Sequence, residues 1–506
     1  MYARLVSLPL FVLLMAIGSA AMIVPSIHAL AIGNHAVSRV FLYWMVLFLI
    51  LTTLIAIAAS GSKPKSQTRS HLSTLVAAYL VLPAMLAVPF FELTRGYGFL
   101  SAWFEMVSSF TTTGATLFDR PYVLPHSLHL WRGLVGWLGG LFIWVVAVAL
   151  LAPLNLGGFE VRAQARSLAR IQGAGQSGAI VDPSERLIHY AARLAPLYAA
   201  ATGLMWLGLI LAGETPFVAV VHAMSVMSTS GISPIGGLYP ADSGILGELI
   251  MFPFFFFALS RLTFSRGLLG EERTAFWKDP EFRLGVALVL LVPSLLFLRH
   301  FFVGFDLASL EGLRAALRSF WGATFTVMSF LTTTGFEAHD WTLAARWAGL
   351  PTPGLALVGL ALVGGGIATT AGGVKLLRVY ALIRHSEREL ERLVHPHSLG
   401  GAGQEARRVR RQGAFVAWAF FMIFAISICG VIVLLSLTGV QFETATVLAV
   451  AAISTTGPLA EVAAEDPIAI SGIPDAAKFI LMLTMVLGRL EAMAIIALLN
   501  PDIWRK

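Results

Sequence analysis

Long apolar stretches alternate along the chain with short polar connections. A helix of about 20 predominantly apolar residues is long enough to cross the hydrocarbon core of a bilayer. Ten stretches of this kind can be drawn, at 5–30, 37–60, 70–91, 129–155, 187–212, 243–265, 282–303, 350–384, 412–438 and 473–499. The pattern therefore predicts an all-α polytopic membrane protein with about ten transmembrane helices.

Four shorter apolar segments lie between the later spans, at 100–110, 217–227, 313–330 and 442–453. Each is too short for a typical span, so we interpret it as a half-helix that enters the membrane without crossing it. Each is followed by a run of hydroxyl residues that ends in glycine, at Gly114, Gly231, Gly335 and Gly457. The unit of span, half-helix, glycine loop and span thus occurs four times, at near-equal spacing.

This internal repeat predicts the organisation of the chain. We expect a two-helix N-terminal part followed by four pore repeats, arranged pseudo-fourfold around one pore. The expected boundaries are 1–62, 63–156, 157–268, 269–398 and 399–506.

Composition and charge agree with a bilayer protein. Hydrophobic residues make up 57% of the chain and charged residues 12%, against roughly 25% charged in soluble domains. The net charge of +7 comes largely from lysine and arginine in the loops at 61–69, 158–186, 261–283 and 375–411. The positive-inside rule places these loops and both termini in the cytoplasm. No basic stretch is interleaved with aromatics in a soluble domain, which excludes nucleic-acid binding.

The glycine loops have the chemistry of an ion site. Non-helical backbone at membrane depth is tolerated where it lines a cavity or is packed in protein. Four loops around an axis would present rings of carbonyl and threonine oxygens to a dehydrated cation. One such motif alone would more often be a helix-packing element, but four copies after four half-helices favour the ion site.

Acidic residues follow the loops and are expected to concentrate cations at the outer mouth, although each could equally belong to a solvated loop. They are Asp119, Asp242, Glu337, Asp340, Glu461, Glu465 and Asp466. Glu105 lies inside a half-helix, where a structural role is as reasonable as an ion-facing one.

A second group of glycines interrupts the predicted span at 350–384. Five glycines lie within residues 364–373, and each costs a helix about 1 kcal/mol relative to alanine. This predicts an unwound loop at mid-membrane depth. Arg489 lies in the last span, where it must pair with an acid such as Glu491 or face an aqueous cavity. Lys375 is interpreted as a snorkelling anchor.

Several motifs together resemble a known family, the bacterial TrkH-type members of the Trk/Ktr/HKT superfamily of potassium transport proteins. The resemblance covers the whole chain and includes the two leading spans. Its motifs are Thr111-Thr112-Thr113-Gly114-Ala115-Thr116, Trp137-Leu138-Gly139-Gly140-Leu141-Phe142-Ile143, Trp277-Lys278-Asp279-Pro280-Glu281-Phe282-Arg283, Glu389-Leu390-Glu391-Arg392-Leu393-Val394-His395-Pro396 and Leu487-Gly488-Arg489-Leu490-Glu491.

The resemblance implies a potassium selectivity filter made by the four glycines and the carbonyls of the two residues before each. Those residues are Thr112, Thr113, Gly114, Thr229, Ser230, Gly231, Thr333, Thr334, Gly335, Thr455, Thr456 and Gly457. Glycine in all four loops goes with potassium preference in the superfamily. The second loop, which reads Ser228-Thr229-Ser230-Gly231-Ile232-Ser233, departs most from the usual pattern.

The resemblance also implies a gate below the filter and a set of partners. The gate consists of Gly364, Gly365, Gly366, Thr369, Thr370, Gly372 and Gly373, with Arg489 as a positive barrier. The implied partners are a second copy of the chain and a cytoplasmic ring of TrkA-like nucleotide-binding subunits on the basic loops at 158–186 and 375–411. Membrane lipids surround the chain, which needs no cofactor, and potassium is the transported ion.

Two other functions were weighed against a channel-like potassium pore in a bacterial inner membrane. A sodium- or proton-coupled symporter would need an intramembrane carboxylate, for which Glu105, Glu443 and Glu491 are candidates. Carriers usually contain inverted repeats, whereas these four copies run in the same sense. A membrane enzyme is disfavoured because His189, His222, His395 and His397 have no metal-ligand spacing.

Overall fold

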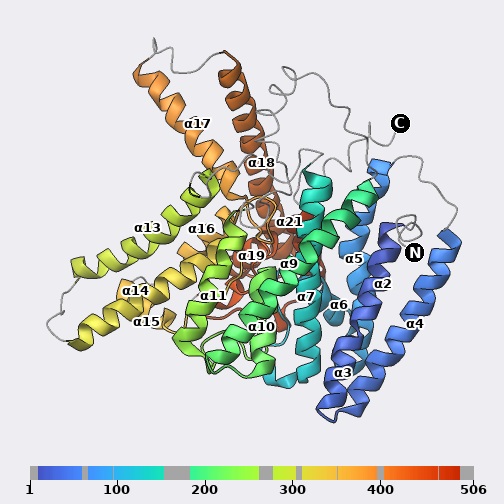
Figure 1. The fold of residues 1–506 in the computed structure, drawn as a ribbon. Coiled ribbons are helices and arrows are strands. Elements are labelled where there is room, and N and C mark those ends of the chain that lie inside the picture. Colours follow the sequence, from blue (N-terminus) through green and yellow to red (C-terminus); the bar gives the residue numbers. More distant parts are fainter. Residues whose placement is uncertain are drawn as a thin grey trace.

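The computed structural model describes residues 9–59, 67–94, 96–152, 183–260, 277, 279–303, 310–349, 352–395, 404–464 and 466–490. Within these ranges all regular elements are helical (Figure 1), which confirms the predicted fold class. The longer helices are α2 (Leu10–Ala21), α3 (Ile23–Ala31), α4 (His35–Ala59), α5 (Gln67–Leu93), α6 (Phe99–Phe110), α7 (His126–Val146), α9 (Pro183–Leu211), α10 (Pro216–Ser228), α11 (Gly244–Leu259), α13 (Pro280–Val303), α14 (Leu310–Leu331), α15 (Trp341–Ala348), α16 (Gly354–Val363), α17 (Leu376–Val394), α18 (Gln404–Leu437), α19 (Phe442–Ile453) and α21 (Asp475–Leu490).

Seven helical stretches in the described part of the chain are long and apolar enough to cross a membrane. Three of the predicted spans differ from this. The span at 243–265 is the 16-residue helix α11, and the span at 350–384 is divided into α16 and α17 by a loop. The last span is described only as far as Leu490, the end of α21.

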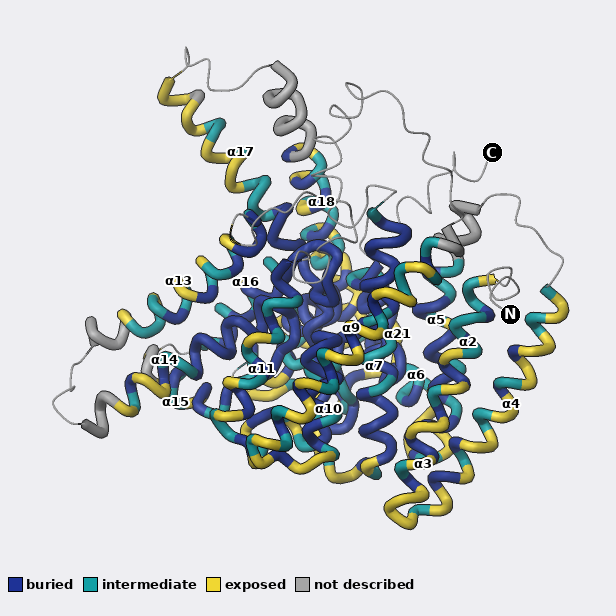
Figure 2. The backbone as a smooth tube through the Cα atoms, in the orientation of Figure 1, coloured by how far each residue is buried: buried dark blue, intermediate teal, exposed yellow. Residues whose placement is uncertain are grey.

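The four repeats pack as a closed ring. The units are α5–α6–α7, α9–α10–α11, α13–α14–α16 and α18–α19–α21, with α6, α10, α14 and α19 in the half-helix positions. The second span of each unit packs on the half-helix of the next, as α7 on α10, α11 on α14, α16 on α19 and α21 on α6. Because the last contact returns to the first unit, the four inner helix ends meet at the centre, where burial is greatest (Figure 2).

The third half-helix is four residues longer than predicted. Helix α14 has 22 residues, Leu310–Leu331, whereas an apolar segment of 18 residues was expected at 313–330. The start of that segment is polar, with Arg314 exposed and Arg318 paired through two nitrogens with Asp340 at 2.8 and 2.9 Å. The apolar part of α14 is therefore shorter than the helix.

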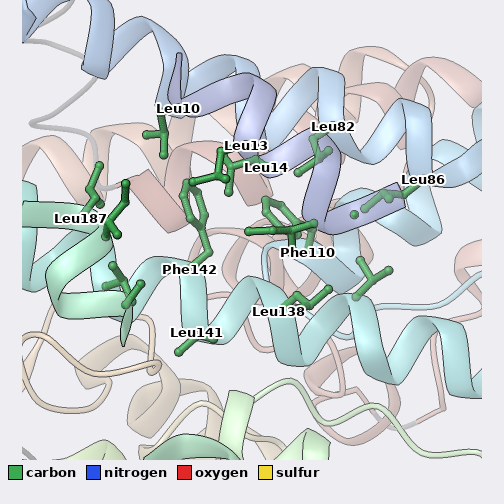
Figure 3. A pocket seen from close by; sticks show the side chains of 16 residues that line it. Leu10, Leu13, Leu14, Leu82, Leu86, Phe110, Leu138, Leu141, Phe142 and Leu187 are labelled. Carbon is green, nitrogen blue, oxygen red and sulfur yellow. The ribbon is translucent and has the colours of Figure 1, made fainter. Parts of the chain in front are cut away.

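The N-terminal helices lie against the outside of the first unit, where α2 packs on α5 and α3 on α7. An apolar cavity of about 140 Å³ lies between α2, α5, α7 and α9 and reaches Phe110, the last residue of α6 (Figure 3). Its lining residues are all apolar, so this space beside the first half-helix offers no polar side chain to an ion.

A buried ion pair fixes the first half-helix to its second span. The Arg132 Nε atom of α7 lies 2.8 Å from Glu105 Oε2 of α6, and the two side chains are 4% and 0% exposed. The N–H is not aimed squarely at that oxygen, so this is an ion contact rather than a hydrogen bond. The other oxygen accepts from Thr116 Oγ1 at 2.9 Å and from the Leu117 N–H at 2.5 Å. Glu105 thus has the structural role, because it ties α6, its glycine loop and α7 together.

This arrangement predicts a large stability loss when one charge is removed. We expect Arg132→Gln to lower the free energy of unfolding by about 3–5 kcal/mol, because Glu105 would be left buried without its counter-charge. Chemical unfolding in detergent micelles measures the change. The control is Arg318→Gln, whose side chain is 52% exposed in its pair with Asp340 and should lose less than about 1 kcal/mol. Equal losses in the two variants would contradict the assignment.

Candidate functional site

The four glycine loops share an unusual backbone conformation. In each loop the second hydroxyl residue is a threonine in the left-handed region. The φ angles are 54° at Thr112, 54° at Thr229, 57° at Thr333 and 53° at Thr455. This region costs a non-glycine residue roughly 1–2 kcal/mol, and a β-branched residue there is a true outlier. Surrounding contacts must therefore hold all four threonines in place.

Hydrogen bonds inside each loop account for part of this support. The N–H of the third hydroxyl residue bonds to the carbonyl five residues earlier, which is the bond that closes a Schellman cap. These bonds join Thr113 to Ser108, Ser230 to Ser225, Thr334 to Ser329 and Thr456 to Ala451, at 2.8–2.9 Å. The first and third hydroxyls of each loop lie 2.8 to 3.3 Å apart. Both are thus turned back toward the end of their own half-helix.

The loops touch one another around the ring. A Cβ atom added to Gly114 would lie 1.7 Å from the Ser230 carbonyl oxygen, so only glycine fits there. The contacts run from Gly114 to Ser230, from Gly231 to Thr334, from Gly335 to Pro458 and from Gly457, whose N–H donates at 2.6 Å, to Thr113. Gly114, Gly231 and Gly335 have positive φ angles, whereas Gly457 does not. The fourth loop therefore contacts the first through a backbone hydrogen bond, and its glycine does not have the left-handed conformation of the other three.

A buried loop at 364–375 connects α16 to α17 and packs against this ring. Its ends are fixed to other helices. The N–H of Gly366 donates to the Ala258 carbonyl at 2.9 Å, and the N–H of Ile367 donates to Glu281 Oε1 at 3.1 Å. The predicted break in the span is therefore present as an ordered, non-helical segment.

This loop reaches the left-handed threonines. Thr229 Oγ1 donates to the Thr370 carbonyl at 2.9 Å, and the N–H of Gly372 donates to Thr333 Oγ1 at 2.7 Å. Gly372 also lies against the fourth loop, since an added Cβ would be 2.3 Å from Thr455 Oγ1. Three of the four glycine loops thus contact the 364–375 loop directly.

Arg489 supplies the fourth connection. Its side chain is 4% exposed, its Nη1 atom donates to the Thr370 carbonyl at 2.7 Å, and its Nη2 atom donates to Thr112 Oγ1. The open space beside it, between α7, α21 and the loop, is about 20 Å³. That is room for about one water molecule, so side chains and the 364–375 loop fill most of the space beside Arg489. Glu491, the alternative partner, lies outside the described residues.

Lys375 corrects the prediction of a snorkelling anchor. It is 7% exposed and has a φ of 84°, and its ammonium group donates to the Ala371 carbonyl. The side chain therefore caps its own loop instead of reaching the membrane surface.

The other candidates are not part of the four glycine loops. His222 is buried and bonds Ser233 Oγ at 2.9 Å through its Nε2 atom, whereas His189 and His395 are exposed. Asp119 accepts from Ser471 Oγ at 2.6 Å, and Glu443 is exposed at the start of α19. His397 and Glu465 lie outside the described residues. Among the described residues no group of three His, Cys, Asp or Glu side chains could hold a metal ion.

Sequence reasoning missed Pro458 and the partner of Glu105. Pro458 lies against both Gly231 and Gly335, where added Cβ atoms would meet its ring at 2.6 and 2.8 Å. Pro458 directly follows the fourth glycine, whereas no proline directly follows the other three glycines. This difference between the loops was the signal that could have identified it. Arg132 carried no signal beyond being a charge in an apolar span.

Four half-helices that end at a central ring of loops, closed by a buried loop and an arginine, define an all-α membrane transport protein of fourfold repeat. Comparison with known proteins agrees: the family model described as TrkH, cation transport protein, matches residues 37–504. The chain therefore belongs to the TrkH family. The members of this family are transporters and not enzymes, which confirms the prediction that the chain is not an enzyme.

Individual relatives are similar over nearly their whole length. The Trk system potassium uptake proteins TrkH of Salmonella typhimurium and of Escherichia coli K12 are each 30% identical to this chain over 98% of both sequences. The crystal structure of the potassium transporter TrkH from Vibrio parahaemolyticus superimposes with a TM-score of 0.78 and 26% identity, and covers 100% of both chains.

An acidic residue follows the third loop. Glu337 is half-buried two positions after Gly335, and burial, together with the negative charge of Glu461, raises its pKa to about 7. Glu337 is therefore neutral below about pH 7 and negative above it. Its charge would attract cations to this side of the ring only in the ionised form.

We expect cation transport to depend on this titration. Between pH 6 and pH 8 the half-saturating concentration of potassium, used as the test cation, should fall several-fold with a midpoint near pH 7, because Glu337 ionises. Radiotracer uptake into proteoliposomes measures this. Glu337→Gln should give a flat profile that matches wild type at pH 6, and Asp242→Asn, at an exposed acid, should keep the wild-type profile. An unchanged pH dependence in Glu337→Gln would refute the role of this carboxyl group.

Proposed function

We propose that this protein takes up potassium across a bacterial inner membrane through a channel-like pore. The observation that carries the proposal is the ring of four glycine loops at the inner ends of the half-helices, with one buried loop and Arg489 closing it. The potassium uptake activity named for its full-length relatives supports the choice of ion.

The ion ligands in this proposal are backbone carbonyls. The first and third hydroxyls of each loop face their own half-helix, and the second contacts the 364–375 loop in three loops and Arg489 in the first. Carbonyl oxygens are therefore the groups left to replace the hydration shell of a cation. The half-helices point their C-termini inward, and this partial negative charge favours cations as well. The proposed filter is Thr112, Thr113, Gly114, Thr229, Ser230, Gly231, Thr333, Thr334, Gly335, Thr455, Thr456 and Gly457.

The gate in this proposal is the loop at 364–375. Its contacts with Thr229 and Thr333 and the position of Arg489 leave space for about one water beside it. A potassium ion cannot pass until the loop moves and the bond from Arg489 to Thr370 breaks. The positive charge of Arg489 adds an electrostatic barrier to the steric one. The proposed gate residues remain Gly364, Gly365, Gly366, Thr369, Thr370, Gly372, Gly373 and Arg489.

The remaining expectations belong to the same proposal. The repeat boundaries are those given from the sequence, and the positive-inside rule places both termini in the cytoplasm. A homodimer with a cytoplasmic ring of TrkA-like nucleotide-binding subunits would move the gate. The proposed docking loop at 158–186 lies mostly outside the described residues. At 375–411 the described part is helix α17 and the start of helix α18.

A coupled symporter is the alternative, and two observations weigh against it. Glu105, a candidate carboxylate with 0% exposure, is paired with Arg132 at 2.8 Å and ties α6 to α7, which is a structural role. Glu443 is exposed at the start of α19, away from the ring. A voltage-driven pore needs neither group.

Ion flux into proteoliposomes that hold the purified chain tests this function. We expect potassium influx to follow the membrane voltage when no sodium or proton gradient is present, and to exceed sodium influx. Gly114→Ser should lose most of this preference, because Gly114 has a φ of 75° and no space for a side chain beside Ser230. A serine there must displace the neighbouring loop.

The matched control is Gly430→Ser, since Gly430 lies in α18 with no atom within 4 Å of an added Cβ. It should keep the selectivity of the wild type. Potassium flux that requires a sodium or proton gradient would overturn the channel in favour of the symporter.

A further inference from the structure

The second hydroxyl residue of each glycine loop has a role that neither the filter nor the gate explains alone. Thr333 Oγ1 accepts from the Gly372 N–H, and Thr112 Oγ1 accepts from Arg489 Nη2. The Thr229 hydroxyl lies between two carbonyls, that of Ser228 at its own helix end at 2.7 Å and that of Thr370 at 2.9 Å. The Thr455 hydroxyl packs against Gly372 and has no hydrogen-bond partner among the described residues. The same residue in all four loops thus stands between the carbonyls of the ring and the loop that closes it.

These threonines are also the strained points of the ring, since each has a left-handed backbone. A β-branched residue keeps this conformation only where its surroundings impose it. The surroundings on one side are the Schellman bonds of the half-helix, and on the other side they are the contacts with the 364–375 loop. Displacing that loop removes these contacts from Thr229, Thr333 and Thr455, and it separates Thr370 from Arg489, the side chain that holds Thr112.

The 364–375 loop both donates hydrogen bonds to the glycine loops and accepts hydrogen bonds from them. The N–H of Gly372 is buried and donates to Thr333 Oγ1 at 2.7 Å, and the Thr370 carbonyl accepts from both Thr229 Oγ1 and Arg489 Nη1. A buried backbone group that loses its partner is penalised. The closed loop is therefore stabilised by the threonines, just as the threonines are stabilised by the closed loop.

We propose that Thr112, Thr229, Thr333 and Thr455 couple the gate to the filter, so that opening the loop relaxes the ring and lowers its preference for potassium over sodium. This inference rests on the proposed function, which supplies the filter and the gate. It adds that ion selectivity and gating are not independent properties of this pore. The four threonines are positioning residues, which act on the ion through the carbonyls next to them.

Two variants test the coupling from opposite sides. Thr333→Val removes the hydroxyl but keeps the β-branched shape, and Gly372→Ala alters the loop and leaves the ring sequence intact. A Cβ on Gly372 would meet the Ser454 carbonyl oxygen at 2.1 Å and push the loop away. We expect each to raise basal potassium flux into proteoliposomes roughly fivefold, which corresponds to one lost hydrogen bond. Both should also lower the potassium-to-sodium flux ratio.

Two controls separate this effect from a general loss of structure. Thr333→Ser keeps the hydroxyl and should restore both the low basal flux and the flux ratio. Thr324→Val makes the same change in the same helix, where the hydroxyl bonds only to the Phe320 carbonyl at 2.8 Å, and should behave as wild type. If Thr333→Val fails to fold, Thr229→Val takes its place.

The outcomes are distinct from those that test the function itself. If Gly372→Ala raises potassium flux and leaves the flux ratio unchanged, the gate works without the filter and the coupling is wrong, while the potassium pore stands. If Thr333→Val and Thr333→Ser behave alike, the hydroxyl has no part in the coupling. Absence of any voltage-driven flux in the wild type would instead refute the pore.

Discussion

The conformation of four threonines constrains the whole centre of this protein. Each half-helix ends in a left-handed threonine, a geometry that its side chain resists. The bonds of the helix end hold it on one side. On the other side the contacts come from the buried loop between α16 and α17 at Thr229, Thr333 and Thr455, and from Arg489 at Thr112. In the proposed function, these contacts keep the ring of carbonyls together and hold the pore closed.

Contacts elsewhere in the fold hold the four glycine loops in place. Each second span packs on the half-helix of the next unit. The buried pair of Glu105 and Arg132 attaches the first loop to its span, and Pro458 fills the space between the second and third loops. The apolar cavity beside Phe110 lies between the first unit and helix α2. An assembly this tightly packed has discrete arrangements rather than gradual ones.

Much of this could be predicted from the sequence. The apolar periodicity gave the all-α class, and the repeated hydroxyl-glycine runs gave the four units, because both depend on local composition. The five glycines at 364–373 marked the broken span for the same reason. The buried state of Lys375, the length of α14 and the bond between Arg489 and Thr112 could not be predicted, since each depends on segments that are distant in sequence and adjacent in space. The left-handed threonines were hidden too, because their residue type argues against that conformation.

The most direct test of closure by the buried loop is the basal potassium flux of Arg489→Gln, measured in proteoliposomes with the purified chain and voltage alone. The account predicts a flux well above that of the wild type, because the variant loses the charge barrier and the link between Thr370 and Thr112. A flux equal to or below that of the wild type, from a variant that elutes as a folded protein, would contradict the conclusion that this arginine and its loop close the pore.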